Sequence, residues 1–439
     1  MSSLVSKLSS KESWDELLLY KTKLAVRGKS QADLEKIIAD QSYIPAVRRI
    51  SSGEPFPLPR RAVISKMSSQ KKRVVYIYPE PENTVLKLLT YLLLRRYDGL
   101  FSDGLYSFRP GVTAKDAVRK LRRTPGISRM WSYKVDISNY FNSVPVERFL
   151  PVLKNAVADD PELFDFLSGL LKEPRVLDYS NSPQELGEEE ERGSIIEEQK
   201  GIMAGTPLSA FYANLYLMDM DCHFQDAGVP YARYSDDIIV FAESKERVEA
   251  LAQEIRDFLA AKGLSVNPKK EQFSSPEEGW TFLGFTYKDG VTDIAPATVT
   301  KIKGKMRRKA RALVRWREKN GRTGEQAAAA FIRVFNRKLL GISKQTDAPE
   351  DVQGPDKEME LQINSLDGPL GEHDLTWSLW FFPVISTTAS LQVIDSYAQD
   401  CLRFIISGKH TKSRFNVRYE DLKALGYRSL VHEYYAFNK

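Results

Sequence analysis

The stretch Tyr231-Ala232-Arg233-Tyr234-Ser235-Asp236-Asp237-Ile238-Ile239-Val240-Phe241 places two adjacent carboxylates between two mostly apolar runs. Both runs have the length and composition of short strands, so residues 229–243 are predicted to form two strands that meet at Ser235-Asp236-Asp237. Carboxylates framed in this way either repel each other or hold a cation. An acidic pair alone is not diagnostic, because Asp159-Asp160 precedes Pro161 and is expected to cap a helix.

A third acid lies 100 residues upstream of this pair, at Asp136. Residues 130–137 alternate in the manner of a strand, with Asp136 near its end. Mg²⁺ prefers oxygen ligands, and a pair of ions about 4 Å apart draws them from several backbone segments. We therefore expect Asp136 to lie beside the Asp236-Asp237 turn, and a separation above about 10 Å would exclude a shared metal pair.

Six stretches then resemble, in order, motifs of bacterial reverse transcriptases of the group II intron and retron-like lineage. They are Tyr106-Ser107-Phe108-Arg109-Pro110-Gly111, Tyr133 to Phe141, Gly201 to Ser209 with Asn214 to Leu217, Tyr234 to Asp237, Gly263 to Asn267 with Lys270, and Phe282-Leu283-Gly284. The stretch at Tyr234 is similar to the family's YxDD motif. One departure is Ala204, where the group II pattern has Gln before a glycine; its absence bears on fidelity and ordinary copying, not on metal chemistry.

The resemblance implies an α+β right-hand polymerase that copies RNA into DNA from dNTPs with two Mg²⁺ ions, Mn²⁺ being possible. Asp136, Asp236 and Asp237 would be catalytic metal ligands, with the backbone of Ile137 as a further ligand. Lys270 would assist near the leaving pyrophosphate. The residues implied in dNTP binding are Lys66, Arg73, Phe141 (a sugar gate that favours dNTPs) and Gly205. Those implied in nucleic-acid binding are Tyr234, Phe282, Leu283, Gly284, Lys301, Lys305, Arg308, Lys309 and Arg315.

Composition and the resemblance together predict six regions along the chain. They are an N-terminal helical extension (1–60), fingers (61–130), a palm with an antiparallel sheet (131–290, acidic insertion 174–200), a helical thumb (296–343), an acidic linker or insertion (344–376) and a helical C-terminal domain (377–439). Within them, residues 44–60 are expected to be a loop or extended arm because of four prolines, residues 205–221 a helix, and residues 281–287 a strand.

Charge is segregated along the chain. The formal net charge is +6, but residues 185–198 carry −6 and residues 345–374 carry −8, so the remainder carries +20. Residues 301–319 alone hold ten Lys or Arg and one acid, on a helix whose other face is apolar. Such a surface attracts a polyanion such as a nucleic-acid backbone, although a solvated helix face is the simpler alternative.

Other protein classes are disfavoured by composition. Two cysteines and four histidines without ligand spacing argue against a disulfide framework and a zinc site. No apolar run is long enough to cross a bilayer and no secretory signal is visible, so a cytoplasmic bacterial protein without membrane contact is expected. The C-terminal region carries no maturase, zinc-binding or HNH signature, which favours the stand-alone, defence-associated "unknown group" enzymes over intron mobility proteins.

Three functions remain open from the residues. The leading one is an RNA-directed DNA polymerase that uses a dedicated structured noncoding RNA in antiphage defence, with a DNA product and possible homo-oligomerisation. The second is template-independent or protein-primed synthesis by the same site, suggested by Ala204 and by Tyr434-Tyr435. The third is a catalytically silent RNA-binding scaffold, against which the intact aspartates weigh.

Overall fold

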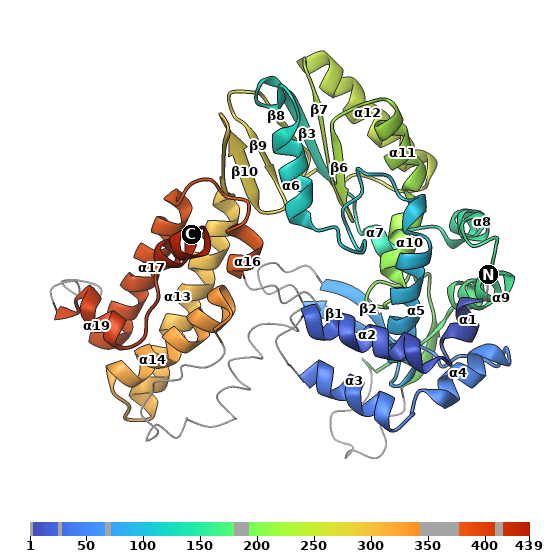
Figure 1. The fold of residues 1–439 in the computed structure, drawn as a ribbon, viewed down its shortest axis with the longest axis horizontal. Coiled ribbons are helices and arrows are strands. Elements are labelled where there is room, and N and C mark those ends of the chain that lie inside the picture. The colour runs from blue at the N-terminus through green and yellow to red at the C-terminus, as the bar shows by residue number, and fades with distance from the viewer. Residues whose placement is uncertain (1–2, 25–28, 66–71, 180–192, 343–376, 409–415) are drawn as a thin grey trace. The chain divides into compact units, whose positions relative to one another are not determined.

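The computed structural model describes residues 3–24, 29–65, 72–179, 193–342, 377–408 and 416–439. The chain divides into two compact units, Met1–Glu277 and Glu278–Lys439, and Figure 1 labels their elements. It is a mixed fold of helices and small sheets. In the described ranges, no helix combines the length and apolarity that crossing a lipid bilayer requires.

Helices make up most of the first unit. They are α1 (Leu4–Lys7), α2 (Lys11–Leu24), α3 (Lys29–Ala39), α4 (Ile44–Ser51), α5 (Glu82–Arg96), η1 (Asp98–Leu100), α6 (Ala114–Arg123), η2 (Ile127–Arg129), α7 (Tyr140–Ser143), α8 (Val146–Ala156), α9 (Pro161–Lys172), α10 (Ser209–Tyr216), α11 (Met218–Asp226) and α12 (Lys245–Ala261). The buried carboxylate of Asp160 caps α9, as expected, and also accepts hydrogen bonds from Ser3 Oγ and the Leu4 N–H. This cap therefore ties the N-terminal helices to the body of the unit.

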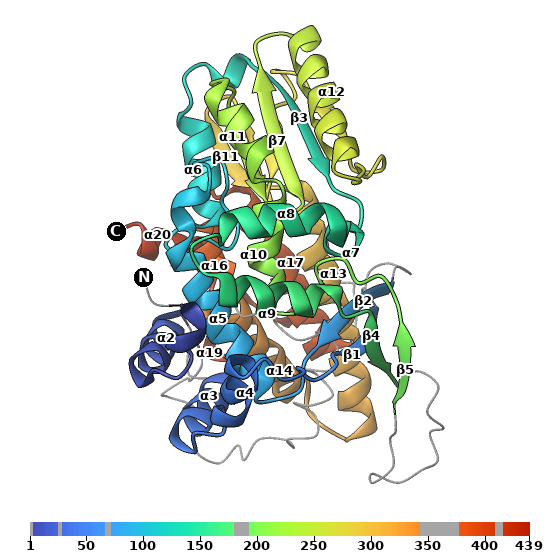
Figure 2. The ribbon, with the colours of Figure 1, turned by 90° about the vertical axis from the view of Figure 1, so that its right-hand side faces the viewer.

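Two four-stranded sheets complete the first unit. One has the order β2-β1-β4-β5, formed by β1 (Arg60–Ser65), β2 (Lys72–Ile77), β4 (Arg175–Asp178) and β5 (Ser194–Glu197). The other is antiparallel with the order β6-β7-β3-β8, formed by β3 (Trp131–Asp136), β6 (Tyr231–Tyr234), β7 (Asp237–Ala242) and β8 (Gln272–Ser274). Strand β7 is central in this sheet, and Figure 2 shows α12 beside β3 and β7. Because β7 is covered on both faces, Ile238 through Ala242 are all buried, which explains a continuous apolar run rather than an alternating one.

The second unit joins a three-stranded sheet to a helical bundle. The sheet has the order β11-β10-β9, formed by β9 (Trp280–Phe282), β10 (Phe285–Lys288) and β11 (Val291–Ile294). The helices are α13 (Pro296–Lys319), α14 (Gly324–Phe335), the π-turn η3 (Asn336–Leu340), α16 (Trp377–Phe381), α17 (Ala389–Ser407), α19 (Tyr419–Ala424) and α20 (Leu430–Phe437). Helices α13, α14 and α17 pack against one another, and the apolar stripe of α13 (Ile302, Met306, Ala310, Leu313) is buried there.

Three expectations about local structure are wrong. Residues 44–51 form α4 rather than a loop, because Pro45 occupies the first helical turn, where its missing N–H is not needed. The helix predicted from residue 205 begins only at Ser209, since Gly205 has φ +98°, and it breaks at Leu217. The single strand predicted over 281–287 is a hairpin of β9 and β10, in which Leu283 and Gly284 both have positive φ.

Candidate functional site

The β6–β7 turn brings the three predicted carboxylates together. Tyr234 pairs with Asp237 across the hairpin, which leaves Ser235 and Asp236 as the turn residues. On the other side of β7, Asp136 at the end of β3 is the direct antiparallel partner of Asp237. Residues opposed in this way have Cα atoms about 4.5–5.5 Å apart. The Ile137 N–H also donates to the Asp236 carbonyl at 3.0 Å, so both acids of the turn lie beside Asp136.

The carboxylates are crowded and poorly solvated. Asp136 is buried. Burial raises the pKa of Asp236 to about 6, and the neighbouring charges of Asp136 and Asp237 add to the shift. The pKa of Asp237 is also raised by burial, partly opposed by the charge of Lys134. The carboxylates lie close together although burial and mutual repulsion disfavour their charged forms. Such a cluster suits a site that binds a cation.

Lys270 supplies one such positive charge. Its Nζ forms an ion pair with Asp136 Oδ2, although the lysine side chain is about half exposed. Among the described residues, no three Asp, Glu, His or Cys side chains are grouped closely enough to hold a metal ion as they stand. The donor chemistry nevertheless fits a divalent cation, since all the ligands are oxygens and their charges repel one another.

A glycine-containing loop places Gly205 next to β2 and links it to Phe141. The Ile202 N–H donates to the Phe141 carbonyl at 2.8 Å. The Tyr76 N–H of β2 donates to the Ala204 carbonyl at 2.8 Å, and a Cβ on Gly205 would lie 2.9 Å from Val75 Cβ. Phe141 is partly exposed, and Arg73 is exposed on the same strand β2. Lys66 lies outside the described residues.

The remaining predicted nucleic-acid residues belong to different elements. Tyr234 precedes the turn, and burial raises its pKa. Phe282, Leu283 and Gly284 form the β9–β10 corner of the second unit, where Phe282 is buried. The side chains of Lys301, Lys305, Arg308 and Arg315 are exposed on α13.

Lys309 differs from the other basic residues of α13. Its ammonium is buried without a hydrogen-bond partner. Burial lowers the pKa of Lys309 to about 8, and the charges of Lys338 and Arg337 contribute. In this conformation its ammonium therefore does not belong to the solvent-facing basic surface of the helix.

Sequence reasoning missed the polar residues that support the turn. Arg233 and Asp221 are fully buried and form a hydrogen-bonded ion pair with Nη2–Oδ2 at 2.5 Å. Ser107 and Asn214, matched as motif residues without an assigned role, are also fully buried beside it. The sequence did contain a signal for this ion pair. Arg233 lies inside the apolar run Tyr231 to Tyr234, and a buried arginine needs a charged or polar partner.

One known protein family matches the part of the chain that holds the six sequence motifs. The family described as reverse transcriptase (RNA-dependent DNA polymerase) matches residues 64–287, which include all three aspartates. The chain belongs to the reverse transcriptase family. Reverse transcriptase domains are in general RNA-directed DNA polymerases that use divalent metal ions, an RNA template and a DNA product.

The solved structures that match this chain include two of telomerase from Candida tropicalis. The apo telomerase truncated from its C-terminal domain is 11% identical with a TM-score of 0.43, and the match covers 54% of this chain and 55% of that one. The apo telomerase is 12% identical with a TM-score of 0.45, covering 88% of this chain and 73% of that one. The reverse transcriptase thus spans about half of the first of these chains. No curated protein matches its sequence.

Proposed function

We propose that this reverse transcriptase polymerises dNTPs at the β6–β7 turn, with Asp136, Asp236 and Asp237 holding two Mg²⁺ ions. The observation that carries the proposal is the pairing of Asp136 with Asp237 in one sheet, next to Asp236, whose pKa is raised. When bound, such ions would activate the primer 3′-OH and neutralise the triphosphate. The protein's own part is to hold the carboxylates at fixed positions, so that little reorganisation accompanies the reaction.

We propose the boundaries of the polymerase subdomains from the order of the sequence motifs. Residues 61–130 would be fingers, 131–290 a palm and 296–343 a thumb, with 1–60 and 377–439 as helical additions. The acidic linker or insertion predicted at 344–376 lies outside the described residues. The exposed cations of α13 (Lys301, Lys305, Arg308 and Arg315) support a thumb that follows a phosphate backbone.

The biological setting is proposed to be bacterial antiphage defence with a dedicated noncoding RNA. Support comes from the motif resemblance to bacterial reverse transcriptases, together with a C-terminal sequence that carries no maturase, zinc-binding or HNH signature. Sequencing the nucleic acid that co-purifies with the protein reports template, product and priming site together. One recurring structured RNA is the expected result, whereas a random sample of cellular RNA would count against a cognate partner.

The test of polymerisation is incorporation of labelled dNTPs by the purified protein with Mg²⁺ and an RNA template–DNA primer. Extension complementary to the template is expected. Homopolymeric product that stays attached to protein would instead favour template-independent, protein-primed synthesis. For that alternative, Tyr435 has a side chain 56% exposed. Absence of any product would leave a binding scaffold.

Phe141 is expected to select the sugar of the nucleotide. Its backbone carbonyl accepts a hydrogen bond from the Ile202 N–H of the loop, and its ring packs against Tyr140 with the ring centroids 5.6 Å apart. We expect the partly exposed ring to meet a ribose 2′-OH. Phe141→Ala should raise the efficiency of NTP relative to dNTP incorporation by about 10- to 100-fold, a typical range for relief of a steric pocket contact. Single-nucleotide kinetics measure the ratio, and Phe141→Tyr, which keeps the bulk, should leave it near the wild-type value. An unchanged ratio in Phe141→Ala would remove the assignment.

Lys270 is expected to compete with the metal for Asp136. Without the ammonium, the carboxylate cluster carries one more uncompensated negative charge. Lys270→Met should therefore tighten Mn²⁺ binding to the apoprotein by roughly two- to fivefold, since an exposed ion pair contributes up to about 1 kcal/mol. Electron paramagnetic resonance titration measures free Mn²⁺ directly. The neighbouring Lys269→Met serves as the control for a general charge effect, and weaker binding in Lys270→Met would contradict the competition.

A further inference from the structure

Ser235, the residue that precedes Asp236, has both of its backbone polar groups held by buried side chains. Ser235 has φ +60°, a conformation that residues other than glycine rarely adopt. Its N–H donates to Ser107 Oγ at 2.9 Å, and its carbonyl accepts from Arg233 Nη1 at 3.3 Å. Both polar groups of this turn residue are therefore satisfied by side chains rather than by water.

Ser107 is itself fixed by Asn214 of α10. The Ser107 hydroxyl donates to Asn214 Oδ1 at 3.1 Å, and Asn214 Nδ2 donates back to the Ser107 carbonyl at 2.8 Å. Since the hydroxyl proton is committed to Asn214, its oxygen lone pairs are free to accept from Ser235. Both residues are completely buried, so water does not compete for these bonds.

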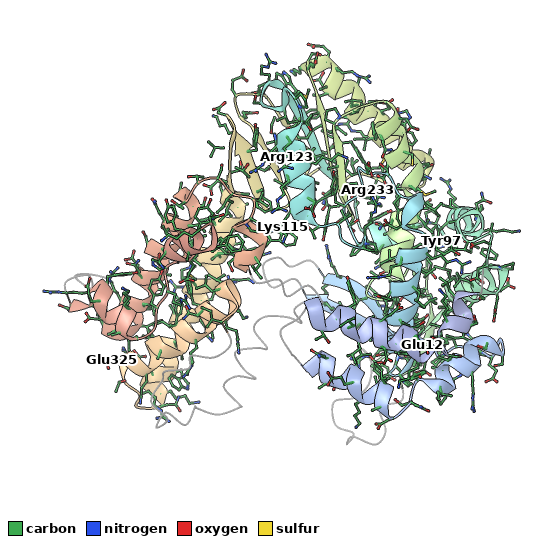
Figure 3. The ribbon with its side chains drawn as sticks, viewed as in Figure 1. Glu12, Tyr97, Lys115, Arg123, Arg233 and Glu325 are labelled. Carbon is green, nitrogen blue, oxygen red and sulfur yellow. The ribbon has the colours of Figure 1, made fainter. Side chains whose placement is uncertain are left out.

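Arg233 is held just as firmly. Asp221 of α11 accepts from its Nε at 2.7 Å and from its Nη2 at 2.5 Å, and Asn214 contributes its carbonyl at 3.2 Å. Tyr231 donates a third hydrogen bond to Asp221 at 2.6 Å. Figure 3 labels Arg233 within the first unit. The remaining nitrogen of the planar guanidinium group, Nη1, donates to the Ser235 carbonyl at 3.3 Å and to the Ala213 carbonyl at 3.4 Å.

A buried ion pair is weak evidence of a role in stability, because well-packed apolar residues often replace it without loss. What this pair adds here is geometry. The ion pair holds Arg233 Nη1 against the carbonyl of Ser235, the residue before Asp236. The Asp236 carbonyl in turn accepts a hydrogen bond from the Ile137 N–H, next to Asp136. The network thus ends on the carboxylate cluster.

We propose that Ser107 and Arg233 are positioning residues for nucleotide addition, which hold the backbone of Ser235 so that the three carboxylates can bind the two metal ions together. This inference rests on the proposed function, since it assigns the support of the same site. Neither residue touches the reacting atoms. Each acts through the backbone of Ser235.

The test uses Ser107→Ala, which removes only the hydroxyl that accepts from Ser235. Ser168→Ala is the matched control, because Ser168 is a buried serine of α9 whose hydroxyl bonds the Asp165 carbonyl, outside this network. Both full-length variants are compared with the wild type for melting temperature, Mn²⁺ affinity of the apoprotein, and kcat and KM for single dNTP addition.

The expected result is that kcat falls by about tenfold to 100-fold in Ser107→Ala, the scale of a misplacement of ~1 Å. Its Mn²⁺ affinity should fall several-fold, the KM for dNTP should change less than kcat, and Ser107→Thr should restore much of both losses. Ser168→Ala should match the wild type in kcat and Mn²⁺ affinity. If Ser107→Ala does not fold, Ser107→Cys, a weaker acceptor of similar shape, takes its place with the same expected direction.

The inference is overturned if Ser107→Ala binds Mn²⁺ and turns over as the wild type does. It is also overturned if its losses in kcat and Mn²⁺ affinity are only those that Ser168→Ala shows for a similar fall in melting temperature. Failure of the proposed function looks different, because the wild type itself would then incorporate no dNTP. The Mn²⁺ titration still compares the variants in that case.

Discussion

Asp236→Asn is expected to abolish nucleotide incorporation while leaving the protein folded and slightly more stable. Asparagine keeps the size of the side chain and removes its charge. Loss of one carboxylate from the proposed metal site should lower kcat by about 10³-fold or more, which corresponds to ~4 kcal/mol of barrier. Single-turnover extension of an RNA template–DNA primer measures this loss.

The stability change should have the opposite sign. The pKa of Asp236 is raised to about 6 in the folded protein, above its ordinary value. At pH 7 the folded state therefore carries a charge that burial and two neighbouring acids disfavour. Removing that charge should stabilise the fold by about 1–2 kcal/mol and raise Tm by a few degrees.

The matched control is Asp226→Asn at the end of α11, where the carboxylate is exposed. This control should change neither activity nor Tm appreciably. Wild-type activity in Asp236→Asn would remove the carboxylate from the chemistry. A marked fall in Tm would show that the crowding inferred for the cluster is wrong.

Gly201→Ala is expected to cause the largest loss of stability among single changes in the loop. Gly201 has φ +55°, and a Cβ there would lie 2.4 Å from the Phe141 carbonyl oxygen and 2.7 Å from the Asn142 carbonyl carbon. These are backbone atoms that cannot turn aside. The sum of conformational strain and overpacking is about 3–4 kcal/mol, and incorporation should fall with it because the loop adjoins Phe141.

Gly228→Ala separates the two contributions. Gly228 has a similar φ of +66°, but nothing lies within 4 Å of the added Cβ. Urea unfolding should therefore show a loss of about 1 kcal/mol in this control, and normal activity. Equal losses in both variants would mean that the loop does not pack against Phe141 and Asn142 as described.

The strands and helices that were predicted correctly depend on short-range patterns. The alternating residues 130–137 contain strand β3 as expected, and β6 and β7 flank the Ser235–Asp236 turn as the two apolar runs indicated. The errors arose where a local signal had two meanings. Proline at the start of α4 was taken for a breaker, and Leu283-Gly284 was taken for strand interior, although glycine with positive φ marks a hairpin corner.

The carboxylate set followed from residue types and motif order, but its supports did not. Nothing near Asp136 in sequence indicates that Lys270 forms an ion pair with it, because 134 positions separate them. Likewise, Ser107 meets Ser235 across 128 positions. Such contacts depend on which strands pair and in which register, and a shift of one residue would turn every side chain of β3 to the other face.

The proposed chemistry of this protein was predicted from its residues alone: acids between apolar runs, basic and acidic segments kept apart, and motifs in a characteristic order. Those features depend on residues that are close together in the sequence, so they can be recognised without knowledge of the fold. Folding alone settled that Asp136 faces Asp237, that the Lys270 ammonium pairs with one carboxylate, and that the buried Ser107 hydroxyl accepts a hydrogen bond from the Ser235 N–H. These are contacts between distant segments, whose geometry is set by the packing of the whole unit.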